Sequence, residues 1–182
     1  MTFVLDANVL ENMLNPAKNQ DGFITEMVAQ IIREKRTIGL DEGLQIDKEY
    51  FKRLGTWISK ADESVARQLL GWLVGASATV LYPHVSRQDV NKSDPLMKCI
   101  QRQMPDKQKH GKKKSLDKDR VYVYVTAKFG GTLITDDQED ILSVATELKK
   151  CAKTHVHKDM EIMDTHSAKA WLANQPAPNP PI

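Results

Sequence analysis

Cysteines, aromatic side chains and long apolar runs are all scarce in this sequence of 182 residues. The only cysteines, Cys99 and Cys151, are too few for a disulfide framework and lack the spacing of a zinc finger. No apolar run approaches the roughly 18 residues of a membrane span. The first residues lack the basic segment, long apolar stretch and cleavage site of a signal peptide. We therefore expect a protein of the cytoplasm that makes no membrane contact.

The composition is otherwise that of an ordinary globular protein. Hydrophobic residues make up 41% of the chain and charged residues 27%, and the formal net charge is only +2. Any affinity for nucleic acid must therefore come from local basic patches. The length suits a single domain with a real core, which we predict over residues 1–174. Residues 175–182 are rich in proline and are predicted to form a disordered tail.

Strand-like and helix-like segments alternate along the chain. Short apolar runs predict strands at residues 1–5, 37–41, 132–135 and 160–163. Apolar residues at helical spacing predict helices at residues 9–14, 23–32, 47–58, 64–75, 94–104, 141–148 and 167–173. Strands separated by helices indicate an α/β fold with a central, mostly parallel sheet.

Two segments allow more than one interpretation. Residues 78–82 suit either a strand or the end of the preceding helix. The run Val121–Val125 alternates β-forming residues, which favours a strand by local propensity. Acids just before it and the pair Gly130–Gly131 after it instead suit the two ends of a helix.

Carboxylates follow two of the predicted strands. Asp6 comes directly after the first strand, and Asp137 follows the strand at residues 132–135. In an open parallel sheet, the crevice outside the carboxyl ends of the strands is where ligands bind, so both side chains would face it. Clustered carboxylates repel one another unless a cation holds them. The pattern thus predicts a hard divalent ion, Mg²⁺ or Mn²⁺, and metal-assisted hydrolysis.

Four short motifs occur in an order that resembles the PIN-domain ribonucleases. They are Val4-Leu-Asp6-Ala-Asn8, Ile46-Asp-Lys-Glu49-Tyr50, the stretch from Asp119 to Ala127, and Leu133-Ile-Thr135-Asp-Asp137. The resemblance spans most of the chain, although residues 59–117 match only in being helical. It implies a three-layer α/β/α sandwich in which residues 121–127 are helical.

The resemblance also implies a set of catalytic residues. It assigns catalysis and metal binding to one acidic pocket made by Asp6, Glu49, Asp119 and Asp137. Neutral hydrogen-bonding groups, Asn8 and Thr135, would position the carboxylates or the attacking water. Three further acids lie close enough in sequence to support the pocket or to compete for its roles: Asp117, Asp136 and Asp140.

A basic stretch precedes Asp119 and has no apolar face. It is expected to be a solvated loop that grips the phosphate backbone through Lys107, Lys109, Lys112, Lys113, Lys114 and Lys118. A loop that only adds solubility is the alternative. RNA is the expected substrate because the resembled family mostly cuts RNA, while the residues alone leave DNA open.

Other functions were weighed against a nuclease. The serious alternative is a catalytically inactive PIN-like module that binds nucleic acid or protein. A response-regulator receiver is disfavoured because only 45 residues follow Asp137, and an aspartyl phosphatase because Asn8 stands where its second Asp belongs. A protein inhibitor or antitoxin and a homodimer are left open as partners, as are roles as a toxin, an RNA-processing enzyme or a defence nuclease.

Overall fold

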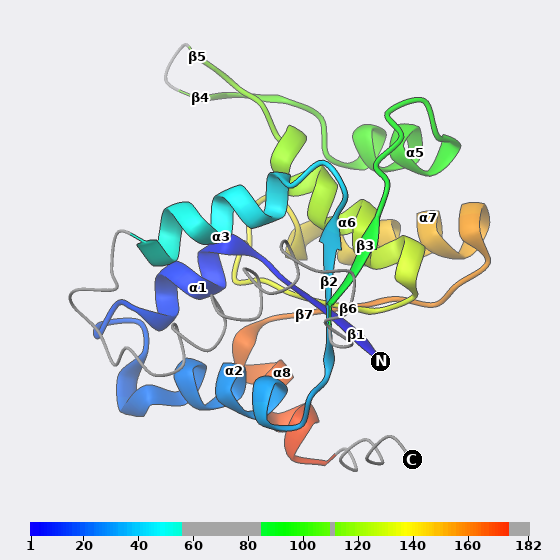
Figure 1. Ribbon diagram of the computed structural model, residues 1–182. Helices are drawn as coiled ribbons and strands as arrows, with labels where there is room; N and C mark the ends of the chain where they lie inside the picture. Colours follow the sequence, from blue (N-terminus) through cyan, green and yellow to red (C-terminus); the bar gives the residue numbers. More distant parts are fainter. Residues whose placement is uncertain (56–84, 110–111, 175–182) are drawn as a thin grey trace.

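The computed structural model describes residues 1–55, 85–109 and 112–174, whose centre is a five-stranded parallel sheet (Figure 1). The strand order is β3-β2-β1-β6-β7, and every neighbouring pair is parallel. The strands are β1 (Thr2–Leu5), β2 (Thr37–Asp41), β3 (Val85–Gln88), β6 (Thr132–Ile134) and β7 (Glu161–Met163). The chain builds the sheet outward from β1 in one direction through β2 and β3, and in the other through β6 and β7. In an open parallel sheet, such a switch point opens a crevice at the carboxyl ends of the strands.

Helices cover the sheet in two layers (Figure 1). Helix α6 (Asp117–Phe129) packs over β1, β2 and β6, and α3 (Gln45–Gly55), α5 (Pro95–Gln103) and α7 (Ala145–Val156) contact it. Helices α2 (Phe23–Arg33) and α8 (Thr165–Ala173) pack together, and Trp171 meets Phe3 of β1 edge to face at 6.0 Å. The other helical segments among the described residues are α1 (Ala7–Met13) and the short 3₁₀ turns η1 (Gln20–Gly22) and η2 (Leu142–Val144). The predicted α/β class, with a central parallel sheet between helical layers, is confirmed.

The ambiguous run Val121–Val125 is helical and lies inside α6. Its side chains are buried all round the helix, so tertiary packing overrides the local preference for a strand. The helix ends at Gly130, whose φ of +65° favours glycine, and its N–H donates to the Ala127 carbonyl. A Cβ on Gly131 would lie 2.4 Å from the Thr2 carbonyl oxygen and would clash with it. Both positions of the pair therefore favour glycine on steric grounds.

Two predictions about the chain were wrong. Strand β3 was not predicted, because Val-Ser-Arg-Gln lacks an apolar pattern and is only half-buried at the sheet edge, where it pairs with β2. The basic stretch is not a loop but an antiparallel hairpin of β4 (Lys107–Lys109) and β5 (Lys112–Lys114). Its backbone register pairs Lys107 with Lys114 and Lys109 with Lys112, and like charges at opposite positions are disfavoured in strands, so the local sequence gives no signal for this hairpin. The predictions for residues 64–75, 78–82 and 175–182 lie outside the described residues.

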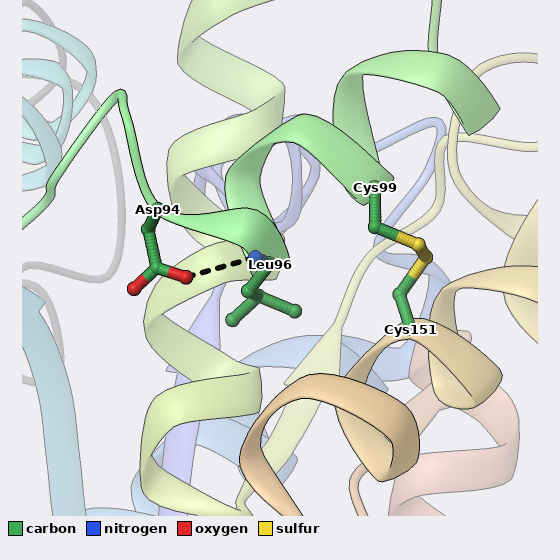
Figure 2. The surroundings of a disulfide bond; sticks show 4 residues. All are labelled: Asp94, Leu96, Cys99 and Cys151. Carbon is green, nitrogen blue, oxygen red and sulfur yellow. Dashed lines mark hydrogen bonds between the residues drawn. A yellow bond between two sulfur atoms is a disulfide. The ribbon is translucent and has the colours of Figure 1, made fainter.

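The two cysteines form a disulfide that joins α5 to α7 (Figure 2). Their Cα atoms are 5.9 Å apart, and 52 residues separate them in sequence. Nearby, Asp94 caps α5 by accepting a hydrogen bond from the Leu96 N–H at 2.8 Å. Disulfides persist mainly in oxidising compartments, so this pair weighs against the cytoplasm inferred from the low cysteine count. No helix in the described part of the chain has the length and apolar character needed to cross a membrane.

Candidate active site

Asp6 lies at the carboxyl end of the central strand β1, where it caps helix α1. The side chain is 5% exposed. Its Oδ1 accepts a hydrogen bond from the Asn8 N–H at 3.3 Å, and its Oδ2 accepts one from the Thr135 hydroxyl at 2.7 Å. The carboxylate is therefore fixed in orientation by the loop after the neighbouring strand β6.

The Thr135 hydroxyl makes hydrogen bonds with three of the predicted site residues. Besides donating to Asp6, it accepts hydrogen bonds from the Asn8 side-chain amide at 3.4 Å and from the Asp137 N–H at 3.1 Å. The Asp137 Oδ1 in turn accepts from the N–H groups of Glu139 and Asp140, at 3.1 and 2.8 Å. Parallel pairing of β1 with β6 thus brings together the two carboxylates expected at these strand ends.

The charged form of Asp6 is disfavoured in this position. Burial raises the pKa of Asp6 from 3.8 to about 6, against the opposing effect of its hydrogen bonds from Thr135 and Asn8. The negative charge of Asp137 raises the Asp6 pKa further. A cation placed between the two carboxylates would remove both penalties.

The neighbouring acid Asp136 is differently engaged. Its Oδ1 accepts hydrogen bonds from the Thr165 N–H and hydroxyl, at 3.1 and 2.9 Å, and its Oδ2 accepts from the Asn12 amide at 2.9 Å. Both oxygens therefore join α1 and α8 to the end of β6. This geometry supports Asp137, rather than Asp136, as the acid available to a ligand.

Helices α3 and α6 supply the other predicted acids. Glu49 on α3 accepts a hydrogen bond from the ammonium group of Lys118, at the start of α6. Its neighbour Tyr50 is fully buried, and its hydroxyl donates to the Leu5 carbonyl and accepts from the Leu5 N–H, which fastens α3 to the end of β1. Asp119 is half-buried in the first turn of α6.

The donor chemistry suits Mg²⁺ or Mn²⁺ with few protein ligands. Within residues 1–55, 85–109 and 112–174, no group of three or more histidine, cysteine or acidic side chains is arranged to hold a metal ion. Mg²⁺ commonly keeps several waters and uses only one or two carboxylates, a role that Asp6 and Asp137 could take. Glu49 is paired instead with the Lys118 ammonium. The complete four-acid pocket stays a prediction.

Supporting acids have structural partners. Asp117 is exposed and pairs with Arg120 at 2.8 Å. The buried Asp140 pairs with Lys107 at 2.5 Å, and the Lys107 ammonium also donates to the Glu139 carbonyl at 3.1 Å. The first residue of the basic hairpin is thereby anchored to the turn that follows Asp137.

Tyr122 on α6 is a candidate site residue that was not predicted from the sequence. Its side chain is 2% exposed, and its hydroxyl has no hydrogen-bond partner among the described residues. Burial raises the Tyr122 pKa, and Tyr50, Asp6 and Glu49 add to the effect; the Ala7 N–H opposes it without the geometry of a hydrogen bond. The signal in the sequence was its spacing, three residues after Asp119 and four after Lys118, which places all three on one helix face.

A cavity of about 340 Å³ adjoins this site at Lys118, between the ends of β2 and β3 and helices α5 and α6. Its polar lining includes Asp41, Asp89, Lys92, Gln101, Asp117 and Lys118. Asp41 is not available there, because its two oxygens accept from the Gln45 and Ile46 N–H groups, at 2.9 and 2.7 Å, at the start of α3.

Comparison with known proteins adds no family assignment. No family model matches the chain. No curated protein matches it, and no solved structure does. The resemblance to PIN-domain ribonucleases therefore depends on the four sequence motifs alone.

Proposed function

We propose that this protein is a divalent-metal-dependent endoribonuclease with a PIN-like active site. The observation that carries the proposal is the arrangement of Asp6, Thr135 and Asp137 at the carboxyl ends of β1 and β6. Asp6, whose pKa is raised by burial and by the neighbouring Asp137, is joined to that residue through the Thr135 hydroxyl, and such a pair of carboxylates forms a site for a hard cation. Such a site suits the hydrolysis of an anionic phosphodiester.

The residues have separate tasks in this scheme. Mg²⁺ or Mn²⁺, when bound, supplies a Lewis acid that offsets the charge developing on the phosphate. Asp6 and Asp137 hold the ion, while Thr135 and Asn8 keep the Asp6 carboxylate in place. The oxygen of a water molecule bonds to phosphorus as the bond to the leaving oxygen breaks with its electron pair. A carboxylate of the site takes the proton from the water, and the leaving oxygen gains one from solvent.

A cleavage assay tests this function directly. The purified protein is incubated with total RNA, and with single-stranded DNA in parallel, in Mn²⁺, in Mg²⁺ and in a chelator. We expect new RNA fragments only with a divalent ion. The inactive binding module would retain RNA in a gel-shift assay and release no fragments under any of these conditions, which would overturn the proposal.

The basic hairpin gives a second prediction, about substrate binding. Its first residue, Lys107, is fastened to Asp140 and to the Glu139 carbonyl, so the hairpin starts at the turn that follows Asp137. Changing Lys109, Lys112, Lys113 and Lys114 to Gln should weaken RNA binding and flatten its salt dependence, because fewer counterions are released. Each lost contact lowers the slope of log affinity against log salt by about 0.7 for a single strand. Lys107 is kept because it supports Asp140.

The control for the hairpin changes four lysines of α7 and of the turn that follows it: Lys149, Lys150, Lys153 and Lys158. It removes the same charge while leaving the hairpin intact. We expect its salt slope to match that of the wild type, measured by fluorescence anisotropy with a labelled RNA. Equal slopes in the hairpin variant and the wild type would show that the hairpin only adds solubility.

A further inference from the structure

The buried hydroxyl of Tyr122 differs from those of the other tyrosines that the structure describes. Tyr50 exchanges hydrogen bonds with Leu5, and the Tyr124 hydroxyl donates to Asp94 at 2.9 Å. Tyr122 is as deeply buried as these two, yet its hydroxyl has no hydrogen-bond partner in the described part of the chain. Leaving such a group unsatisfied costs roughly 1–3 kcal/mol, so an unpaired buried hydroxyl needs an explanation.

The position of Tyr122 supplies one. Helix α6 packs against β1, which ends just before Asp6, and against α3, which carries Glu49. Tyr122 lies one helical turn after Lys118, whose ammonium contacts Glu49, and on the same face of α6. The charges of Asp6 and Glu49 both act on its hydroxyl. The Tyr122 side chain is therefore buried where α6 packs against the elements next to these two acids.

We propose that Tyr122 is a further residue of the catalytic site, whose hydroxyl donates a hydrogen bond to the attacking water between Asp6 and Glu49. The inference depends on the proposed nuclease function and extends it. Thr135 approaches Asp6 from the loop after β6, and Asn8 approaches it from α1. Tyr122 belongs to α6, where it would add a neutral donor beside the Lys118 ammonium that is paired with Glu49.

The opposing explanation is that Tyr122 only fills the core with its ring. The two explanations differ in what the hydroxyl does, and Tyr122→Phe removes the hydroxyl while keeping the ring. Tyr124→Phe is the matched control, because it removes a hydroxyl two residues further along the same helix that bonds to Asp94. Thermal melts, Mn²⁺ titrations followed by the electron spin resonance of the free ion, and steady-state cleavage of a labelled RNA are measured for both variants.

The expected pattern separates the two variants. Without metal, Tyr122→Phe should melt no lower than the wild type, because its hydroxyl makes no hydrogen bond to the described residues, whereas Tyr124→Phe should melt lower. With metal, Tyr122→Phe should lower kcat by about 10- to 100-fold, with little change in KM for RNA, and weaken Mn²⁺ binding. Tyr124→Phe should leave kcat, KM and Mn²⁺ binding unchanged.

Each other outcome has a defined meaning. Unchanged kcat and Mn²⁺ binding in Tyr122→Phe, in a protein that cleaves RNA, would overturn the role of Tyr122 and leave the nuclease function standing. Weakened Mn²⁺ binding in a protein that cleaves no RNA would support the place of Tyr122 beside the metal and reject the nuclease function. An equal loss of kcat in both variants would show that the loss comes from disturbed packing of α6, which would overturn the inference.

Discussion

Replacing Asp6 by Asn is expected to abolish RNA cleavage, lowering kcat by at least about 100-fold, while leaving the protein folded. Asp6 supplies a metal-binding charge, and losing it should exceed the roughly 10- to 100-fold effects of residues that only support a ligand. The fold should tolerate Asn because it caps a helix as well as Asp does and keeps an oxygen for the Asn8 N–H. Circular dichroism checks the fold, and the RNA cleavage assay checks the activity.

The pair Asp136 and Asp137 provides an internal control for this prediction. Asp137→Asn should lose activity as Asp6→Asn does, because the charge that acts on Asp6 disappears. Asp136→Asn should keep most of the activity and lose some stability, since both Asp136 oxygens accept hydrogen bonds from Asn12 or Thr165. The opposite ranking would show that Asp136 is the functional acid. Near wild-type cleavage by Asp6→Asn would remove the proposed site altogether.

Adding Mn²⁺ to the metal-free protein is expected to raise its melting temperature by about 5–10 °C at a concentration near 100 times Kd. Binding to the folded state alone adds about 2.7 kcal/mol under these conditions, and a domain of this size gains about 2–4 °C for each kcal/mol. The gain arises because the cation offsets the burial of Asp6 and its repulsion by Asp137. Differential scanning fluorimetry measures it. A melting temperature that millimolar Mn²⁺ does not move would count against the clustering of these acids.

Protonation of Asp6 should also stabilise the metal-free protein. The Asp6 pKa is about 6 in the folded protein, above its ordinary value of 3.8, so the folded state binds this proton more tightly than the unfolded state. The stabilisation is complete below pH 3.8 and is lost as the pH rises through 6. It amounts to at most about 3 kcal/mol, from roughly 1.4 kcal/mol for each unit of pKa.

Comparison with variants separates the stabilisation by Mn²⁺ and by protonation of Asp6 from the effects of other titrating groups. Glu34, Asp94 and Asp164 have lowered pKa values and oppose Asp6, because their stabilisation is lost in acid. The difference in stability between wild type and Asp6→Asn cancels the contributions of these three acids, and it should shrink as the pH falls from 7 to 4.

A variant with Asp6→Asn, Glu49→Gln, Asp119→Asn and Asp137→Asn should show no rise in melting temperature with Mn²⁺. A response equal to that of the wild type would place the metal elsewhere.

Several elements of the fold could be predicted because their residues carry a local signal. The buried strands β1 and β2 are short apolar runs, and α2 carries buried residues at helical spacing. The edge strand β3 carries no such signal, since one polar strand is held there mainly by backbone pairing with β2. The hairpin of β4 and β5 was missed for the same reason, because a run of lysines has no apolar face to mark it.

The sequence by itself determined the α/β class and which acids follow strands, because the period of the apolar residues and the end of each run are local properties. Only the tertiary structure decided that Thr135 joins Asp6 to Asp137 and that both oxygens of Asp136 are occupied. It also decided that, among the described residues, the Tyr124 hydroxyl bonds to Asp94 while the Tyr122 hydroxyl has no hydrogen-bond partner. These features depend on contacts between residues far apart in the chain, and no local pattern encodes which buried polar group finds a partner.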